Sequence, residues 1–175
     1  MLYFSSDQHL NHVASIRMCE RPFDTIEEMN RTLIQNINAR VTNRDTLYLM
    51  GDVAHKGTVE EANKLIAKMN GKKILIRGNH DRQYDESLFE EICDFKEIHV
   101  EQGGQHYNLS LMHYPMMEWP KSHHGGIHLH GHSHNKPEYN LEQKAQGIRR
   151  YDVGVDANWF YPVSLQDILT FMELQ

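Results

Sequence analysis

The sequence predicts a layered α/β domain. Three observations support this class: helical segments with clear amino-terminal signals, short apolar runs typical of strands, and an alternation of the two along the chain. The length of 175 residues suits one hydrophobic core, so we expect residues 1–175 to form a single domain. Hydrophobic residues make up 39% and charged residues 24% of the chain, which excludes wholesale disorder.

Three segments carry helix signals. Thr25 and Glu28 form a capping-box pattern ahead of the first apolar face. Thr58 and Glu61 repeat the pattern, Gly71 supplies a stop signal, and Ser164 opens the third helix. The three apolar faces comprise Ile26, Met29, Leu33, Ile34 and Ile37; Val59, Ala62, Leu65, Ile66 and Met69; and Leu165, Ile168, Leu169 and Met172.

Short apolar runs between these helices predict strands. They are residues 2–5, 46–50, 73–77, 107–112, 127–130 and 151–155. Helices separate the first three runs, which predicts a parallel core. The closer spacing of the later runs favours antiparallel hairpins.

Residues that can bind metal follow five of the six predicted strands. They are Asp7 and His9, Asp52, Asn79 to Asp81, His113, and His132 with His134. Open α/β sheets place their sites beyond the carboxyl ends of strands. Turn formation alone would explain Asp52 or Asn79. It does not explain why histidines arrive at the same places, so the pattern predicts a metal site.

The residue types indicate which metals are expected. Mixed imidazole, carboxylate and amide ligands suit Mn, Fe, Ni, Co or Zn better than calcium or magnesium. Hydrolytic two-metal sites hold the ions roughly 3.5–4 Å apart, so a ligand must bridge them, one carboxylate oxygen per ion. Asp52 is the central candidate for this bridge. We therefore expect two divalent transition-metal ions, with manganese favoured.

Read in order, these blocks resemble the calcineurin-like metallophosphoesterase superfamily. Its pattern is D-x-H, G-D, G-N-H-D/E, a lone H and G-H-x-H, which this sequence matches at residues 7–9, 51–52, 78–81, 113 and 131–134. The resemblance implies a four-layered α/β/β/α sandwich with mixed sheets flanked by helices. The segments Ser6–His12 and Arg21–Phe23 look closer still to a group of small single-domain bacterial and phage members.

The resemblance also implies a role for each residue of the pattern. The first metal would be bound by Asp7, His9, Asp52 and His134, and the second by Asp52, Asn79, His113 and His132. His80 matches the catalytic histidine of the family, and Asp81 would orient its imidazole. The implied reaction is in-line attack of a metal-bound hydroxide on phosphorus, with His80 stabilising charge or protonating the leaving oxygen.

Residues outside the pattern allow more than one interpretation. His12 could contact substrate or lie in a solvated loop, and Arg82 could meet a substrate phosphate or form a surface ion pair. We expect His55 at the surface, where it could also contact substrate. His128 and His130 alternate with apolar residues along a predicted strand, so we expect structural roles for them.

Two further segments stay open between alternatives. Residues 114–120 contain Trp119 and two prolines and could form either a wall of the substrate cleft or part of the core, whereas we expect His123 and His124 in the next loop to be solvated. Asp156 follows the last predicted strand and could support the site without binding metal.

The predicted function is a dinuclear-metal-dependent phosphoesterase, with hydrolysis of a small or nucleotide-like phosphodiester favoured. A net charge of −6 argues against an extended nucleic-acid surface. No apolar run is long enough to cross a membrane, no signal peptide is evident, and two cysteines suit a cytoplasmic location. The alternatives are a phosphomonoesterase, a protein phosphatase, or a non-catalytic interaction scaffold of the same fold. The complete set of ligand positions favours an enzyme.

Overall fold

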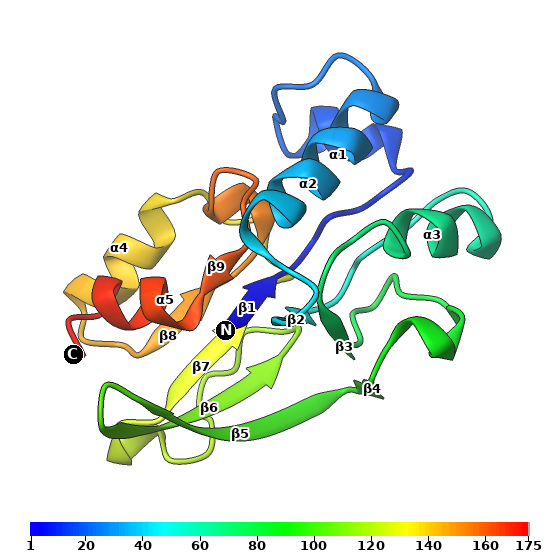
Figure 1. Cartoon of the computed structure of the whole chain (residues 1–175). Coiled ribbons are helices and arrows are strands. Elements are labelled where there is room, and N and C mark those ends of the chain that lie inside the picture. The colour runs from blue at the N-terminus through cyan, green and yellow to red at the C-terminus, as the bar shows by residue number, and fades with distance from the viewer. Residues whose placement is uncertain (175) are drawn as a thin grey trace.

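The computed structural model describes residues 1–174, and within them two mixed sheets carry helices on their outer faces (Figure 1). The first sheet has the order β4 (Glu91–Cys93), β3 (Lys72–Ile76), β2 (Thr46–Leu49), β1 (Leu2–Ser5) and β9 (Val163–Ser164). Its first four strands are parallel and β9 is antiparallel. The second sheet has the order β5 (Phe95–Gln102), β6 (Gln105–Met112), β7 (Ile127–His130) and β8 (Arg150–Asp152).

The helices complete the layers. Figure 1 shows α1 (Val13–Met18), α2 (Ile26–Arg40) and α3 (Val59–Ile66) on one side of the first sheet. The second sheet lies on its other side, where α4 (Glu138–Ala145) packs against β8 and α5 (Leu165–Phe171) contacts β9 and β1. The predicted four-layered α/β class is therefore confirmed. Among the described residues, no helix has both the length and the apolar character needed to cross a membrane.

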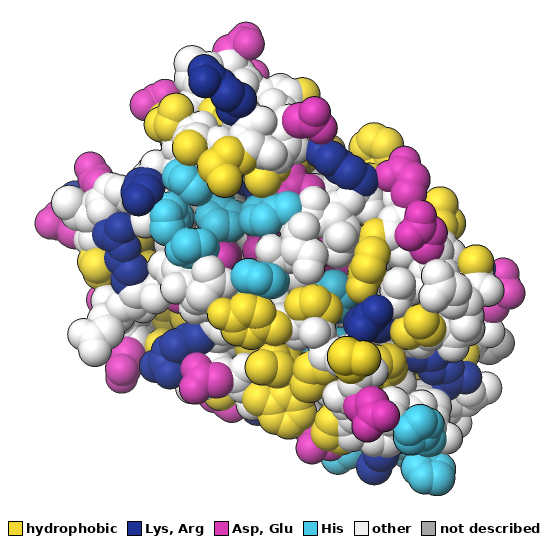
Figure 2. Space-filling view, turned by 180° about the vertical axis from the view of Figure 1, so that it is seen from behind, with side chains coloured by type: hydrophobic (Ala, Val, Ile, Leu, Met, Phe, Trp, Pro, Cys, Tyr) yellow, Lys and Arg dark blue, Asp and Glu magenta, His cyan; other side chains and the backbone are white. Residues whose placement is uncertain are grey.

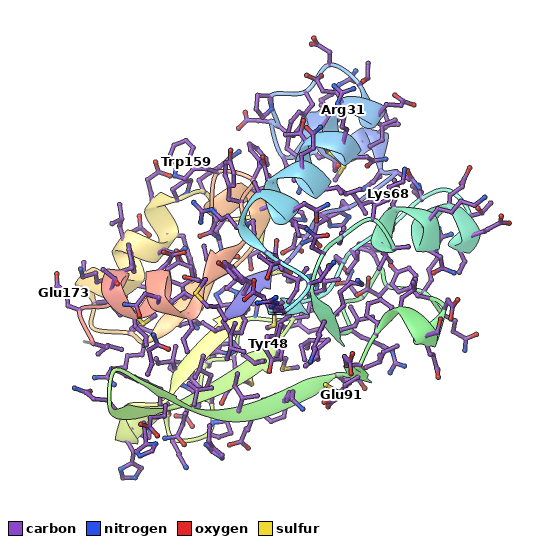
Figure 3. The ribbon with its side chains drawn as sticks, in the orientation of Figure 1. Arg31, Tyr48, Lys68, Glu91, Trp159 and Glu173 are labelled. Carbon is purple, nitrogen blue, oxygen red and sulfur yellow. The ribbon has the colours of Figure 1, made fainter. Side chains whose placement is uncertain are left out.

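Two hydrophobic cores hold these layers together. In the first, Leu33 and Ile37 of α2 and Ile66 of α3 pack against Leu47 and Leu75 of the first sheet. The second core lies between the sheets and contains Phe4, Tyr48, Met50, Leu109, Leu111, Ile127 and Leu129. Figure 3 shows Tyr48 between the sheets, whereas Arg31 and Lys68 point outward. The apolar faces predicted for α2 and α3 are thus the faces that are buried.

The predicted helix caps are present with one difference. Thr58 and Glu61 form a complete capping box, and so do Ser164 and Asp167. Thr25 accepts the bond from the Glu28 N–H, but the Glu28 carboxylate reaches the N–H of Asp24 instead. The first helix therefore begins as predicted with only half of the box.

The prediction of antiparallel hairpins among the later strands is mostly wrong. Only β5 and β6 form a hairpin, whereas β6–β7 and β7–β8 are parallel. The chain returns between them through residues 113–126 and 131–149, segments long enough for parallel crossovers. The strand predicted at 151–155 ends at Asp152, because Val155–Ala157 turns into a short 3-10 helix. Strands β4, β5 and β9 and helices α1 and α4 were not predicted.

The two sheets meet at the carboxyl ends of β1 and β8. The Ser6 N–H donates to the Val153 carbonyl, and the Val155 N–H donates to the Ser6 carbonyl. The Asp7 N–H reaches across to the carbonyl of Gly51, which follows β2. The loops that carry the predicted ligands are therefore bonded directly to one another.

Candidate metal centre

A first group of ligand-type residues is formed by the loops after β1 and β7. Asp7, His9 and His134 offer atoms that all lie within 4.8 Å of one another. The Nε2 atoms of His9 and His134 are 3.1 Å apart, and Asp7 Oδ1 is 3.9 Å from His134 Nε2. Asp7 and His9 are buried, whereas His134 is partly exposed.

A second group lies beside the first. Asp52, His113 and His132 again place ligand atoms within 4.8 Å of one another. Asn79 joins them, because its Oδ1 lies 3.2 Å from His113 Nε2 and 3.1 Å from His132 Nδ1. The structure thus brings together each of the residue sets that the sequence pattern assigned to separate metals.

Asp52 stands between the two groups. Its Oδ2 lies 3.5 Å from His9 Nε2 and 3.5 Å from His113 Nε2. Its Oδ1 accepts a 2.8 Å hydrogen bond from the backbone N–H of His80. A single oxygen therefore faces both groups, which differs from the expected arrangement of one carboxylate oxygen per ion.

Backbone strain is concentrated in these loops. Five residues of the two groups have positive φ angles: Asp7 at 60°, His9 at 51°, Asp52 at 54°, His132 at 70° and His134 at 48°. This left-handed conformation is uncommon for residues other than glycine. Residues in such conformations cluster at functional sites, where the surrounding structure holds them. Inter-loop bonds such as His9 N–H to the Asp52 carbonyl, at 3.0 Å, supply that support here.

Two glycines are required by close approach of these loops. A Cβ at Gly131 would lie 2.1 Å from Ser6 Oγ and 2.3 Å from Asp7 Oδ2. A Cβ at Gly78 would lie 2.3 Å from Asp52 Oδ1. Any side chain at these positions would displace a carboxylate of one of the groups.

Burial and charge make the centre suitable for a cation. Burial raises the pKa of Asp7 to about 7 and lowers the pKa of His9 to about 3. Burial also acts to raise the pKa of Asp52, but bonds from His113 and the His80 N–H outweigh it and lower the pKa to about 2. The centre therefore contains an ionised carboxylate beside a neutral imidazole, and both are metal-ligand forms.

Unpaired polar atoms provide a test of whether a metal fits. Asp7 Oδ1 and His9 Nδ1 are buried without a hydrogen-bond partner among residues 1–174. Buried polar atoms are rarely left unpaired, so a carboxylate oxygen in this state requires an explanation. Asp7 Oδ1 faces the imidazole nitrogen of His134, and a cation bound among these atoms would pair it. The donor set, with imidazole, carboxylate and amide atoms, fits divalent transition-metal ions.

His80 lies at the edge of the centre. Its Nε2 is 4.0 Å from Asp52 Oδ2, and its side chain is 38% exposed, so it remains accessible to a bound molecule. The prediction that Asp81 orients the His80 imidazole is wrong. The Asp81 carboxylate instead accepts bonds from the backbone N–H groups of Asp52, Val53 and Gly78 and from the Tyr84 hydroxyl. Asp81 therefore fixes the loop that carries Asp52.

His55 contacts His80 in place of Asp81. The His55 ring lies with its centroid 3.9 Å from that of His80 and 4.4 Å from that of His12. His55 is partly exposed beside the centre, which agrees with its predicted surface position, and its contact with substrate stays a prediction. Arg82 donates to the carbonyls of His55 and Gly57, each at 2.6 Å. Arg82 therefore shapes the loop beside His80, a role that neither predicted alternative, a substrate phosphate or a surface ion pair, included.

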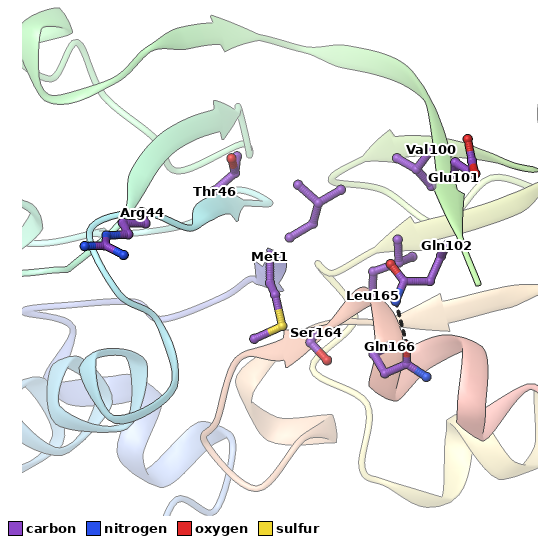
Figure 4. A pocket seen from close by; sticks show the side chains of 10 residues that line it. Met1, Arg44, Thr46, Val100, Glu101, Gln102, Ser164, Leu165 and Gln166 are labelled. Atoms are coloured by element: carbon purple, nitrogen blue, oxygen red, sulfur yellow. Dashed lines mark hydrogen bonds between the residues drawn. The ribbon is translucent and has the colours of Figure 1, made fainter. Parts of the chain in front are cut away.

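A cavity of about 300 Å³ adjoins both groups. It is lined by His12, His80 and His132, by Met18 at the end of α1 and by Cys19 directly after it. Figure 2 shows several histidines gathered in one patch of the surface with hydrophobic side chains beside it, and other histidines apart from it at the lower right. Another cavity, of about 370 Å³, is lined by Met1, Thr46 and Gln102 among others (Figure 4). It lies at the amino-terminal ends of β1 and β2 and contains none of the ligand-type residues.

The remaining histidines of β7 are structural, as predicted. His128 Nδ1 lies 2.9 Å from the Ser110 carbonyl, and its Nε2 accepts from the Met116 N–H. His130 contacts the Tyr139 hydroxyl of α4. The side chains of His128 and His130 are both fully buried. The alternation expected along this strand is absent, because each of its four residues is buried.

The loop after β6 contributes one aromatic residue to the core and another to the edge of the site. Trp119 is 9% exposed and its indole N–H donates to the Gly126 carbonyl, so it belongs to the core. Tyr114 is 40% exposed, and its ring centroid lies 4.6 Å from that of His132. Tyr114 thus borders the second group, a position that the sequence pattern did not distinguish from that of Trp119.

Comparisons with known proteins agree with this geometry. A family model described as calcineurin-like phosphoesterase matches residues 2–159, a span that includes every residue of the two groups. An uncharacterized protein of Methanocaldococcus jannaschii is 35% identical over 175 residues, covering 98% of this chain and 91% of the relative. The gene 66 protein of Mycobacterium phage L5 is 26% identical over 193 residues, covering 95% and 91%. A solved structure of a protein of unknown function from Aquifex aeolicus has a TM-score of 0.73 and 27% identity, covering 97% of this chain and 98% of that one.

Proposed function

This chain belongs to the calcineurin-like phosphoesterase family, and we propose that it hydrolyses a small phosphodiester with two divalent cations at the candidate metal centre. The observation that carries the proposal is the position of Asp52, whose Oδ2 is 3.5 Å from an imidazole nitrogen of each group. A carboxylate oxygen placed between two ligand sets is the bridge that a dinuclear site requires.

The ligands proposed for the two cations follow from these distances. The first position uses Asp7, His9, Asp52 and His134, and the second uses Asp52, Asn79, His113 and His132. Manganese is the cation we favour, among the transition metals that suit this donor set.

The reaction chemistry is divided between the cations and the chain. When bound, the two cations supply Lewis-acid activation of a water molecule and of the phosphoryl oxygens. His80 borders the cavity with its imidazole partly exposed, within reach of a bound ester. We assign it the stabilisation of charge on the departing group or the protonation of the leaving oxygen.

The preference for a diester rests on the charges around the cavity. No lysine or arginine is among the residues that line it. The nearby Arg82 has two of its guanidinium nitrogens bonded to backbone carbonyls. A monoester dianion would need additional cationic donors of the kind that arginine supplies. The half-exposed ring of Tyr114 offers a face on which an aromatic group could stack, which favours a nucleotide-like ester.

Metal dependence is the direct test of this proposal. We expect dialysis against a chelator to abolish hydrolysis, and Mn²⁺ to restore it with a content approaching two ions per chain. A panel of Mn²⁺, Ni²⁺, Co²⁺, Zn²⁺ and Mg²⁺, assayed with elemental analysis, identifies the effective metal. Full activity in protein that contains no divalent metal would contradict the proposal.

Substrate preference is tested with a matched pair of esters. We expect bis(p-nitrophenyl) phosphate to have a kcat/KM at least about tenfold above that of p-nitrophenyl phosphate, or about 1.4 kcal/mol in transition-state stabilisation. The physical reason is that no lysine or arginine lines the cavity to bind the second negative charge of the monoester. Both esters are measured with the same metal at the same pH. A higher value for the monoester would replace the phosphodiesterase by a phosphatase and leave the metal proposal intact.

A further inference from the structure

Arg21 is a buried arginine whose role neither the sequence pattern nor the proposed reaction explains. It follows α1, and its side chain is 0% exposed. Its Nε and Nη2 donate to the two carboxylate oxygens of Asp156, at 2.9 and 2.8 Å. This is the bidentate geometry in which an arginine and a carboxylate pair most strongly. A charged pair buried this completely is costly to desolvate, so its retention favours a specific role.

Asp156 connects this pair to the first group. Its Oδ2 lies 2.8 Å from Nδ1 of His134. An ionised carboxylate only accepts hydrogen bonds, so Nδ1 of His134 must carry the proton. The other ring nitrogen, Nε2, is the one that faces His9 at 3.1 Å. In the neutral imidazole that binds a cation, Asp156 therefore selects the tautomer in which Nε2 presents a lone pair to the first position.

The same guanidinium also holds the loop that supplies the other two residues of the group. Its Nη2 donates to the carbonyl of Asp7 at 2.7 Å, and its Nη1 donates to the carbonyl of Gln8 at 2.9 Å. Asp7 and His9 have positive φ angles, so this loop needs external bonds to keep its shape. The Arg21 guanidinium thus supports both the loop that carries Asp7 and His9 and, through Asp156, the imidazole of His134.

The second group has no equivalent support from a charged pair among the described contacts. His113 Nδ1 lies 2.8 Å from the backbone carbonyl of Met50, a neutral acceptor. The amide oxygen of Asn79 contacts His113 Nε2 and His132 Nδ1 on the side of the proposed cation. The two positions therefore differ in what stands behind one imidazole of each: the buried Asp156 carboxylate behind His134 in the first, and the Met50 carbonyl behind His113 in the second.

We propose that Arg21 and Asp156 are positioning residues that set the affinity of the first cation position selectively. This inference rests on the proposed function, because it assumes two cations. Cys19, whose Sγ is 3.4 Å from His134 Nδ1, could be read with His134 and Asp156 as a separate metal group. Both Asp156 oxygens are already engaged by the positive charge of Arg21, which opposes a cation there.

The test uses Asp156→Asn and calorimetric titration of the metal-free protein with Mn²⁺, followed by elemental analysis. An asparagine must direct its NH₂ group either at Nε of Arg21, or at both Nη2 of Arg21 and Nδ1 of His134, and the second choice also selects the wrong tautomer. We expect the affinity of one position to fall about 10- to 100-fold, the usual effect of removing such a supporting contact. The affinity of the other position should stay within about threefold of the original.

Asp45→Asn is the matched control. Asp45 is also buried and pairs with a positive charge, the amino terminus, but at the opposite end of β1. Its replacement should leave both Mn²⁺ affinities unchanged. Arg21→Lys provides a second test if Asp156→Asn does not fold. Lysine keeps the positive charge but lacks the paired N–H donors with which the guanidinium binds the carboxylate. This variant should weaken the same single position.

The outcomes separate this inference from the proposed function. If the wild-type protein binds no Mn²⁺, the proposed function fails. Suppose instead that the wild-type protein binds two ions. If the folded Asp156→Asn variant, or Arg21→Lys where Asp156→Asn does not fold, also binds two ions with unchanged affinities, only the positioning inference fails. Equal weakening of both positions, or three ions per wild-type chain, would also overturn it.

Discussion

Asp52→Asn should empty both cation positions and lower kcat by at least about 10²- to 10³-fold, the loss that follows removal of one central electrostatic group. The orientation of the new amide is dictated by the backbone. The His80 N–H donates to Oδ1, so the amide oxygen must remain there. The NH₂ group then takes the place of Oδ2, which lies 3.5 Å from His9 and from His113. A donor would point at the place where a bridging anion is needed.

The measurement pairs elemental analysis with Mn²⁺ titration. His9→Ala and His113→Ala are the controls, because each removes a ligand from only one proposed position. Each should weaken one Mn²⁺ affinity strongly, whereas Asp52→Asn should weaken both by more than about 100-fold, beyond the effect of a supporting contact. Retention of one ion at the original affinity in Asp52→Asn would show that Asp52 does not bridge.

The parts of the fold that the sequence predicts are those with strong local periodicity. Helices α2, α3 and α5 carry capping residues and continuous apolar faces, and β1, β2 and β3 are compact apolar runs. Strand β5 was missed because its residues alternate between exposed and half-buried, and charged side chains interrupt the apolar pattern. The parallel order of β6, β7 and β8 depends on where long connections return, which no local pattern encodes.

In the candidate site, too, one part could be predicted from local sequence and the other could not. Its ligand-type residues follow strands directly, so the spacing of strands and glycines brings them to one edge. The contacts behind them join loops far apart in the sequence. Asp81 bonds to the backbone of Asp52, 29 positions earlier, and Arg21 pairs with Asp156, 135 positions later. Such pairings depend on tertiary structure, which explains why the role of Asp81 was mispredicted and that of Arg21 was not foreseen.

His80→Ala should leave both Mn²⁺ affinities near their original values and lower kcat by about 10²- to 10⁴-fold, the usual contribution of a general acid. The bond from this residue to Asp52 comes from its backbone N–H, which alanine retains. Its imidazole is 4.0 Å from Asp52 Oδ2, beyond hydrogen-bonding distance. Removing the ring therefore takes away a group at the edge of the cavity and preserves the contact that orients the proposed bridge.

Two esters with different leaving groups distinguish the possible tasks of His80. Protonation of the leaving oxygen matters little for p-nitrophenolate and much more for unsubstituted phenolate, which is the stronger base. If His80 is the acid, the kcat deficit of His80→Ala should be larger with diphenyl phosphate than with bis(p-nitrophenyl) phosphate. Equal deficits would assign charge stabilisation instead. His124→Ala, at an exposed position in the loop before β7, is the control and should behave as wild type. Loss of both cations in His80→Ala would show that its imidazole is a ligand, and the assignment of His80 as the residue acting on the departing group would be wrong.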